Sequence, residues 1–352
     1  MLDVFNFLFE AAEKDENIYF VYVDGAVTRL FSSEFALKHP NRFIKVGIAE
    51  NNAVSLAAGL AMRGKTVYVI GLAAYMAGRS YEQIRLDVAY NHANVKIIGF
   101  ISGLSSSKAG YSHWAIDDVN LMRMLPNMTV ATPGTENEWK AVLERSLKHK
   151  GPMYISYNNG NPMKLSYSVD KSGISTIMEG SDFAIMSLGS AVNEANKLAN
   201  QMIELGYSPT LLSCYLPKPF CFEKIEKILD QKMPIVTFEE QLSSGGVGEM
   251  IASFMAQKRK VVPILSCHVE ESEFNFIGNI PWLREKTMHL SQVPARIVSL
   301  IKPSKGIVNV KVSTDKKGHL VQKWYLFHII LLLKKRRKNG KDKRYLFGLI
   351  RF

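Results

Sequence analysis

The chain has 352 residues, of which 47% are hydrophobic, so it is long enough for two ordinary domains that each bury a core. Its three cysteines, Cys214, Cys221 and Cys267, are too few and too scattered for a disulfide framework or a zinc cluster. We therefore expect a reducing, cytoplasmic setting and no metal ligands in this chain. The N-terminus has no basic run before its apolar residues, and no segment reaches the roughly 18 apolar residues of a membrane span, so neither a signal peptide nor a transmembrane helix is predicted.

The formal net charge of +12 is concentrated at the carboxyl end of the chain. Residues 302–352 hold 15 of the 44 lysines and arginines and only two acids, Asp315 and Asp342. Residues 1–301 are therefore close to neutral, and the high isoelectric point describes the tail alone. This distribution argues against a nucleic-acid partner for the body of the protein.

Short apolar runs alternate with stretches of helical periodicity in the first half of the chain, which is typical of a parallel sheet covered by helices. The predicted strands span residues 18–23, 66–70, 95–101, 129–132 and 153–157. The predicted helices lie near residues 51–62, 80–90, 117–124 and 137–149. Such helices supply the crossovers that parallel strands need.

A second series follows a polar linker at residues 166–177. Its predicted strands span residues 183–187, 209–215, 235–239 and 261–266. Its predicted helices lie near residues 192–205, near residues 222–229 and near residues 293–301, and a further helix is predicted to begin at the glycines of 245–248. The sequence therefore predicts an α/β protein with two doubly wound domains and mainly parallel sheets, at residues 1–165 and 178–301.

Residues 302–352 do not continue this pattern. Ten mostly apolar residues, 324–333, are followed by the basic run 334–338. This segment is too short to span a bilayer but could lie on an anionic membrane surface. The alternative, which we favour, is a disordered or non-native extension, because nothing in the body anticipates it.

The residues around Glu50 carry the strongest indication of chemistry. Residues 42–49 (RFIKVGIA) predict a short strand and a turn, and residues 53–61 (AVSLAAGLA) predict a helix of small side chains. Glu50 would lie in the first turn, where the helix dipole favours a carboxylate. The small side chains would let the helix pack closely on a sheet or a neighbouring subunit. Taken alone, an acid at this place usually only caps a helix.

In its context, this segment closely resembles the pyrimidine-binding domain of transketolases and 1-deoxyxylulose-5-phosphate synthases. The resemblance implies that Glu50, as the glutamate of the "IAE" motif, hydrogen-bonds the aminopyrimidine ring of thiamine diphosphate. That contact promotes loss of the thiazolium proton. Stabilisation of the resulting carbanion belongs to the cofactor.

Residues 65–85 resemble the next strand and helix of this family, where aromatic side chains enclose the pyrimidine. Aligned on Arg79 and Gln83, the stacking phenylalanine of the family falls at Met76, with Tyr75 beside it. The resemblance therefore implies that Tyr75, Met76 and Arg79 contact the cofactor, and a methionine can pack against a ring face. The alternative is that Tyr75 and Met76 are ordinary core residues.

Residues 109–119 resemble the "DGxTHQ" loop of the family and the helix that follows it. The resemblance places His113 where a histidine faces the reacting oxygens of the substrate, and an imidazole can exchange protons with a hydroxyl near neutral pH. The alternative is a structural histidine.

The second half of the chain resembles the C-terminal domain of transketolases, which serves structure and dimerisation. The resemblance lies in residues 183–190, Lys218-Pro219, residues 237–240 and the glycine run of 245–248. The glycine run could also indicate a phosphate-binding loop, although glycines alone are weak evidence for one. The resemblance covers residues 1–301 and leaves the tail outside.

The "GDG…N" motif that holds Mg²⁺ and the diphosphate in thiamine diphosphate enzymes is absent from the sequence. In one-chain transketolases the domain with that motif precedes the pyrimidine-binding domain. We therefore expect a split enzyme in which a separate diphosphate-binding subunit ligates Mg²⁺ and the active site lies between the two chains. Self-association through the C-terminal domain would then give an α2β2 heterotetramer.

Family residues that anchor a sugar phosphate are also replaced. The expected arginine falls at residues 157–159, the expected histidine at Ile101, and the aspartate of the loop at Ala109. Neutral groups at the arginine position remove bidentate phosphate recognition. We therefore predict a small-molecule sugar or 2-oxo acid substrate other than the usual sugar phosphates, unless the partner chain supplies the cations.

These features predict transfer of a two-carbon ketol unit between sugars or sugar-like substrates. One alternative is the β subunit of a 2-oxoacid dehydrogenase, which shares the architecture, although the 113–118 loop and the helix at Arg85 look more like transketolase. Another alternative is a catalytically silent interaction subunit, which the departures at Met76 and Ala109 suggest.

Overall fold

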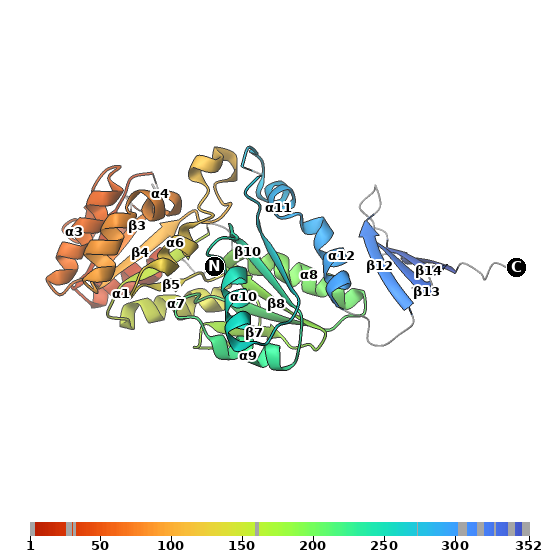
Figure 1. Ribbon diagram of the computed structural model, residues 1–352. Helices are drawn as coiled ribbons and strands as arrows, with labels where there is room; N and C mark the ends of the chain where they lie inside the picture. The colour runs from red at the N-terminus through yellow and green to blue at the C-terminus, as the bar shows by residue number, and fades with distance from the viewer. Residues whose placement is uncertain are drawn as a thin grey trace, which may run out of the picture.

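The computed structural model describes residues 4–25, 30, 33–158, 162–272 and 274–301 with their side chains, and beyond residue 301 the backbone of four strands. Figure 1 shows two α/β domains that lie against each other, with the strands of the tail beyond the second domain. No helix among the described residues is long and apolar enough to cross a membrane.

The first domain is built on a six-stranded parallel sheet in the order β2-β1-β3-β4-β6-β5. Its strands are β1 (Ile18–Tyr22), β2 (Phe43–Lys45), β3 (Thr66–Leu72), β4 (Val95–Phe100), β5 (Thr129–Ala131) and β6 (Met153–Tyr157). Its α-helices are α1 (Val4–Lys14), α2 (Glu34–Lys38), α3 (Glu50–Met62), α4 (Ala73–Arg79), α5 (Tyr81–Gln83), α6 (Asp118–Met124) and α7 (Glu136–Lys148).

Shorter helical turns complete this domain. The π-helix η2 (Ile84–Tyr90) continues α5, so the predicted helix at residues 80–90 is present but divided. Two 3₁₀ turns, η3 (Ser107–Ala109) and η4 (Tyr111–His113), lie between β4 and α6.

The central strands are apolar throughout because helices cover both faces of the sheet. Every residue of β4 is buried, as is all of β3 except Leu72. Helix α3 lies against this sheet through Ala53, Ala57 and Ala58, whose small side chains are buried in the same core as the strand residues. The close approach of α3 positions its first residue, Glu50, beside the carboxyl ends of the strands.

The second domain has a five-stranded sheet in the order β11-β10-β8-β9-β7, with β7 antiparallel to β9 and the other pairs parallel. Its strands are β7 (Ile174–Met178), β8 (Phe183–Leu188), β9 (Pro209–Cys214), β10 (Ile235–Leu242) and β11 (Ile264–Val269). Its helices are η5 (Gly189–Ala191), α8 (Val192–Glu204), α9 (Phe222–Asp230), α10 (Val247–Lys258), α11 (Ile280–Met288), η6 (Leu290–Gln292) and α12 (Val293–Leu300).

Two doubly wound α/β domains were predicted, and this fold class is confirmed. Strand β7 begins inside the predicted linker. It was not predicted as a strand because it lies at an edge of the sheet, where the mixed polar and apolar sequence Ile-Ser-Thr-Ile-Met is tolerated. The two domains share one hydrophobic core, in which Val119, Met122 and Leu125 of the first domain join Leu188 and Val247 of the second. The domains therefore pack as one unit.

The tail forms a four-stranded antiparallel sheet of β12 (Val308–Thr314), β13 (Leu320–Leu326), β14 (Ile329–Arg336) and β15 (Asp342–Leu346). The apolar run at residues 324–333 is divided between β13 and β14. The side chains of residues 302–352 lie outside the described residues. Membrane-surface contact and disorder of the tail therefore stay predictions.

Lys96 in β4 is fully buried, which is unusual for a lysine. Its Nζ donates hydrogen bonds to Asn94 Oδ1 at 2.5 Å and to the Gly151 carbonyl at 2.6 Å. Both acceptors are neutral. Burial, with a smaller contribution from the charge of Lys150, lowers the pKa of Lys96 to about 7.

Replacing Lys96 by Met is expected to make the free energy of unfolding depend less on pH above pH 7. Between pH 7 and about 10.5 the unfolded chain keeps a proton on Lys96 that the folded chain has released, so the free energy of unfolding rises with pH in this window. Lys96→Met should remove a rise of roughly 3–5 kcal/mol, measured by urea unfolding between pH 6.5 and 10. Lys140→Met, at an exposed position on α7, is the matched control. Parallel pH curves for wild type and Lys96→Met would contradict the assignment.

Candidate cofactor and catalytic site

Glu50 is the first residue of α3 and is 2% exposed. The preceding residue, Ala49, makes no side-chain hydrogen bond that caps the helix. Glu50 is the only acid in the first turn of α3. Its position at the positive end of the helix dipole stabilises the negative charge. Its Oε2 accepts a hydrogen bond from Arg79 Nη1 at 2.8 Å, and this contact is also an ion pair.

Arg79 lies in the last turn of α4 and links Glu50 to an aromatic side chain. Its guanidinium carbon lies 4.7 Å from the centroid of the Tyr75 ring, within the range of a cation–π contact. The Arg79 side chain is 49% exposed, whereas that of Glu50 is 3% exposed, so the pair has one buried and one open partner. Asn51 strengthens the junction of α3 and α4, because its Nδ2 donates to Arg79 O at 3.2 Å and to Gln83 Oε1 at 2.6 Å.

Tyr75 in turn contacts His113. Its hydroxyl lies 3.0 Å from His113 Nε2, and the two rings meet edge to face with centroids 5.4 Å apart. The other ring nitrogen, Nδ1, lies 2.9 Å from Ser112 Oγ. A neutral imidazole has one donor and one acceptor nitrogen, and each nitrogen here has a hydroxyl that can play either role. The imidazole is therefore oriented whichever tautomer is present.

The residues Glu50, Arg79, Tyr75 and His113 thus form a continuous line of contacts, which we call the Glu50–His113 line. They follow the carboxyl ends of β2, β3 and β4, the edge where open α/β sheets bind ligands. Four of the five predicted site residues are therefore brought together.

Met76, the fifth predicted site residue, lies in the core of the first domain. It is fully buried, and a Cβ at Gly71 would lie 2.6 Å from its Sδ. Its side chain fills the space left by that glycine in β3 and offers no exposed face to a ligand. Tyr75, which is half-buried, is the aromatic residue that borders the site.

Asp118 is a buried polar residue that sequence reasoning missed. It is fully buried at the start of α6, and burial raises its pKa to about 6, although hydrogen bonds from Tyr154, Gln241 and Ser156 act in the opposite direction. Two adjacent acids follow the His113 loop in the sequence, but nothing in the local pattern showed which would be buried.

The glycine run 245–248 does not form an open phosphate-binding loop. The carboxylate of Glu239 occupies the N-terminus of α10, where it accepts hydrogen bonds from Val247 N at 2.8 Å and Gly248 N at 3.1 Å. These amides are the donors that a phosphate would need. The structural interpretation of this glycine run is therefore the better one.

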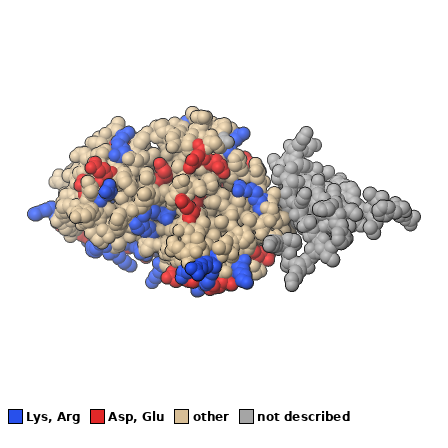
Figure 2. All heavy atoms as spheres, viewed as in Figure 1, with Lys and Arg blue, Asp and Glu red and all other residues tan. Residues whose placement is uncertain are grey.

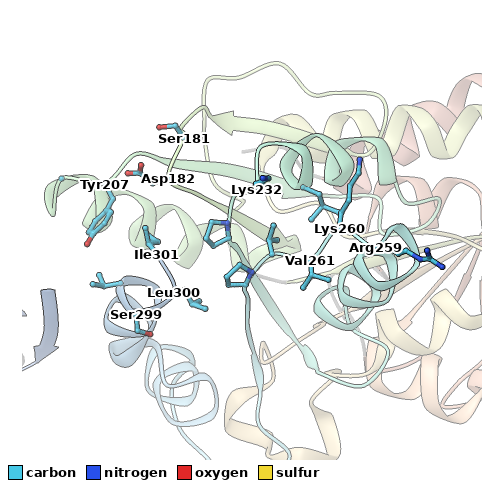
Figure 3. Close-up of a pocket in the computed structure, with 16 residues that line it drawn as sticks. Ser181, Asp182, Tyr207, Lys232, Arg259, Lys260, Val261, Ser299, Leu300 and Ile301 are labelled. Atoms are coloured by element: carbon cyan, nitrogen blue, oxygen red, sulfur yellow. The ribbon is translucent and has the colours of Figure 1, made fainter. Parts of the chain in front are cut away.

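A hollow among the described residues lies in the second domain and shares no residue with this line. Figure 3 shows it in the second domain, lined by residues such as Asp182, Lys232 and Arg259. Asp182 precedes β8, and Pro234 and Pro263 precede β10 and β11, so the hollow lies at the amino ends of the strands. The hollow thus belongs to the second sheet, whereas the catalytic candidates follow the carboxyl ends of strands in the first sheet.

Charged side chains give no separate indication of a site. Acidic and basic side chains both appear across the visible face of the two domains in Figure 2. Among the residues that the structure describes, no group of three or more His, Cys, Asp or Glu could hold a metal ion.

Comparisons with known proteins identify both domains. Residues 6–164 match the transketolase pyrimidine-binding domain, and residues 174–272 match the transketolase C-terminal domain. A subunit of an apulose-4-phosphate transketolase from Actinobacillus succinogenes is 30% identical over 254 residues, which are 71% of this chain and 82% of the relative. A 6-deoxy-6-sulfo-D-fructose transketolase subunit from Clostridium sp. is 31% identical over 283 residues, 79% of this chain and 87% of the relative.

Solved structures show the same relationship. A split gene transketolase, described as an inactive beta4 tetramer, superposes with a TM-score of 0.73 at 26% identity. The superposed region is 85% of this chain and 96% of the split gene transketolase chain. The chain spans less than half of one-chain relatives such as the 1-deoxy-D-xylulose-5-phosphate synthase of Shouchella clausii, of which it covers 41% at 31% identity. The chain therefore belongs to the transketolase family, as a subunit of the split type that consists of the pyrimidine-binding and C-terminal domains.

Proposed function

We propose that Glu50 and His113 are the catalytic residues that this chain contributes to a thiamine diphosphate-dependent transketolase, which transfers a two-carbon ketol unit between sugars or sugar-like substrates. The observation that carries the proposal is the Glu50–His113 line at the carboxyl edge of the first sheet. Tyr75 and Arg79 are the proposed cofactor contacts. The full burial of Met76 argues against a direct contact with the cofactor.

The residues present fit the aminopyrimidine part of the cofactor. Glu50 Oε2 is bound to Arg79, whereas Oε1 accepts no hydrogen bond from any residue in the described part of the chain. That oxygen is available to a ring nitrogen of a ligand, on a side chain that is only 3% exposed. Tyr75 offers a half-buried ring that packs against Arg79, the partner of Glu50.

The proposed roles follow from these contacts. The cofactor, when bound, supplies the stabilisation of a carbanion at the substrate. Glu50 holds a proton between its carboxylate and the ring, and Arg79 keeps the carboxylate oriented. His113 exchanges a proton with a substrate oxygen, while Tyr75 and Ser112 orient its ring.

We further propose that a separate diphosphate-binding subunit ligates Mg²⁺ and completes the site. The names of the relatives as transketolase subunits support a second chain. Self-association through the C-terminal domain would give an α2β2 heterotetramer. Buried, unpaired Cys214 and Cys267 support a reducing, cytoplasmic location.

The substrate that we propose is a specialised sugar. The names of the relatives include apulose-4-phosphate and 6-deoxy-6-sulfo-D-fructose, which are both unusual sugars with an anionic group. In this chain the positions expected to bind a phosphate hold neutral side chains, including Ile101 and Asn158. The partner chain would then provide any cation that binds an anionic group.

Reconstitution with the partner chain tests this proposal. A chain with a "GDG…N" domain, encoded next to this one, is co-expressed with it, and thiamine diphosphate with Mg²⁺ is added. We expect ketol transfer only from the two chains together, and thermal stabilisation of the complex that rises with cofactor concentration. Absence of thiamine-dependent stabilisation would favour the silent-subunit alternative. Transfer to a lipoyl acceptor would favour the 2-oxoacid dehydrogenase alternative.

A further inference from the structure

The loop that carries His113 is closed at its base by a backbone bridge. Gly103 N donates to Ala115 O at 3.0 Å, and Ala115 N donates to Gly103 O at 3.1 Å. Two consecutive residues of the second domain, Glu240 and Gln241, reach this base from β10. They are 5% and 4% exposed.

Glu240 holds the start of the loop. Its Oε2 accepts a hydrogen bond from Leu104 N at 3.3 Å, and a Cβ at Gly103 would lie only 2.5 Å from the same oxygen. Gly103 also has a φ of +61°, so glycine is required here both by conformation and by the approach of the carboxylate. Arg284 fixes Glu240 from the other side, donating from Nε to Oε1 at 2.6 Å, and bonds Glu194 Oε1 at 3.1 Å.

Gln241 holds the end of the loop. Its Nε2 donates to Ala115 O at 3.2 Å and to Asp118 Oδ1 at 2.8 Å. Asp118 Oδ2 accepts from Tyr154 OH at 2.8 Å and from Ser156 Oγ at 3.0 Å. An ionised carboxylate only accepts hydrogen bonds, and here it has three donors from two domains. Gln241 thereby ties the loop and α6 to the second domain.

A third contact lies at the tip of the loop. Tyr111 stacks on Phe274 of the second domain with ring centroids 4.5 Å apart. Figure 1 shows the segment between β4 and α6 lying beside the end of the second domain that holds α11. The loop is thus held by the second domain at its start, its end and its tip, whereas Tyr75 of its own domain contacts the imidazole.

We infer that Glu240 and Gln241 are positioning residues for His113, so that the C-terminal domain sets the place of a catalytic side chain in addition to its structural role. This inference rests on the proposed function for the role of His113. No hydrogen bond among the described residues joins either side chain to His113 itself, so both act through the backbone of the loop.

The test compares Glu240→Gln and Gln241→Leu with Glu239→Gln in the full chain. Glu239 is a matched control, because it is the neighbouring buried carboxylate, accepts two hydrogen bonds as well, and bonds only α10 within its own domain. Hydrogen–deuterium exchange of residues 104–116 and the rate at which diethyl pyrocarbonate modifies His113 are measured. Neither readout needs the cofactor or the partner.

We expect Glu240→Gln and Gln241→Leu to speed amide exchange in residues 104–116 and modification of His113 by about tenfold. Glu239→Gln should leave both rates within about twofold of wild type and speed exchange only at the start of α10. Unchanged loop exchange in a folded Glu240→Gln or Gln241→Leu chain would overturn the inference. An equal effect of Glu239→Gln would overturn it too, since it would show general loosening of the domain.

Activity in the two-chain complex separates positioning from general damage. We expect Gln241→Leu to lower kcat by about tenfold while the concentration of thiamine diphosphate that gives half-maximal activity stays within about twofold, because Glu50 is held by α3 and α4. Equal loss of both quantities would indicate a merely structural role. If the complex is inactive with wild type, the proposed function fails, whereas the exchange result still decides whether the second domain holds the loop.

Discussion

Replacing Glu50 by Gln is expected to lower ketol transfer by the two-chain complex by roughly 10²- to 10⁴-fold while the chain stays folded. Glutamine has nearly the same shape and can still accept the hydrogen bond from Arg79 Nη1 through its carbonyl oxygen. It cannot hold a proton between itself and the cofactor ring. The chemistry is therefore lost and the packing at the start of α3 is retained. Initial rates at saturating thiamine diphosphate measure the effect.

Glu34→Gln is the matched control for this variant. Glu34 is also an acid in the first turn of a helix, α2, but it is exposed. We expect its replacement to change the rate by less than about twofold, since the helix dipole alone contributes little at an exposed site. If Glu50→Gln retained turnover within a few fold of wild type, Glu50 would be a helix-capping acid and the proposed role would be wrong.

The second large effect is expected at His113. Replacing it by Ala should lower kcat of the complex by roughly 10²-fold or more, because the proton exchange with the substrate oxygen is lost. Binding of thiamine diphosphate should change little, because the carboxylate of Glu50 and its pairing with Arg79 remain. Turnover and cofactor titration on the same preparation separate the two quantities.

Two further variants grade the role of the His113 ring. Tyr75→Phe removes the hydroxyl 3.0 Å from Nε2 and should lower kcat by about two- to tenfold, the worth of one hydrogen bond. Tyr90→Phe, at a tyrosine that is 79% exposed, should have no effect. A His113→Ala enzyme with nearly wild-type kcat would show that this histidine is structural.

Buried strands and the family motifs could be predicted from sequence, because each is specified by a few consecutive residues. Strands β3 and β4 are covered on both faces and so appear as continuous apolar runs. The strand predicted at residues 261–266 begins three residues before β11 (Ile264–Val269). β11 is an edge strand in which buried and half-buried residues alternate, so it has no continuous apolar run to mark its ends. Strand β7 was assigned to a linker for a similar reason.

Helices α1, α2 and α11 are among those absent from the predicted elements. Helix α2 has only five residues, too short for a clear periodic signal. Helix α11 begins with Asn279 as its N-cap and has no clear apolar face, since only Leu283, Thr287 and Met288 are buried. Helix α1 has a clear apolar face, and its omission has no physical reason in the sequence.

The sequence by itself placed Glu50 in the first turn of a helix of small residues, because the strand, the turn and the helix follow one another within twenty residues. It also placed His113 in a loop between a strand and a helix. These are local features, which depend on neighbouring residues and on backbone geometry.

Only the tertiary structure decided which side chains surround them. The Glu50–Arg79 and Tyr75–His113 contacts join residues 29 and 38 positions apart, and the Leu104–Glu240 contact spans 136 positions. The same packing directs Met76 into the core beside Gly71 and Tyr75 toward the site. Such contacts depend on how helices and domains pack, and no local pattern specifies that. Glu50 is therefore recognisable from the sequence, whereas the line of contacts from Glu50 to His113 is decided by the fold.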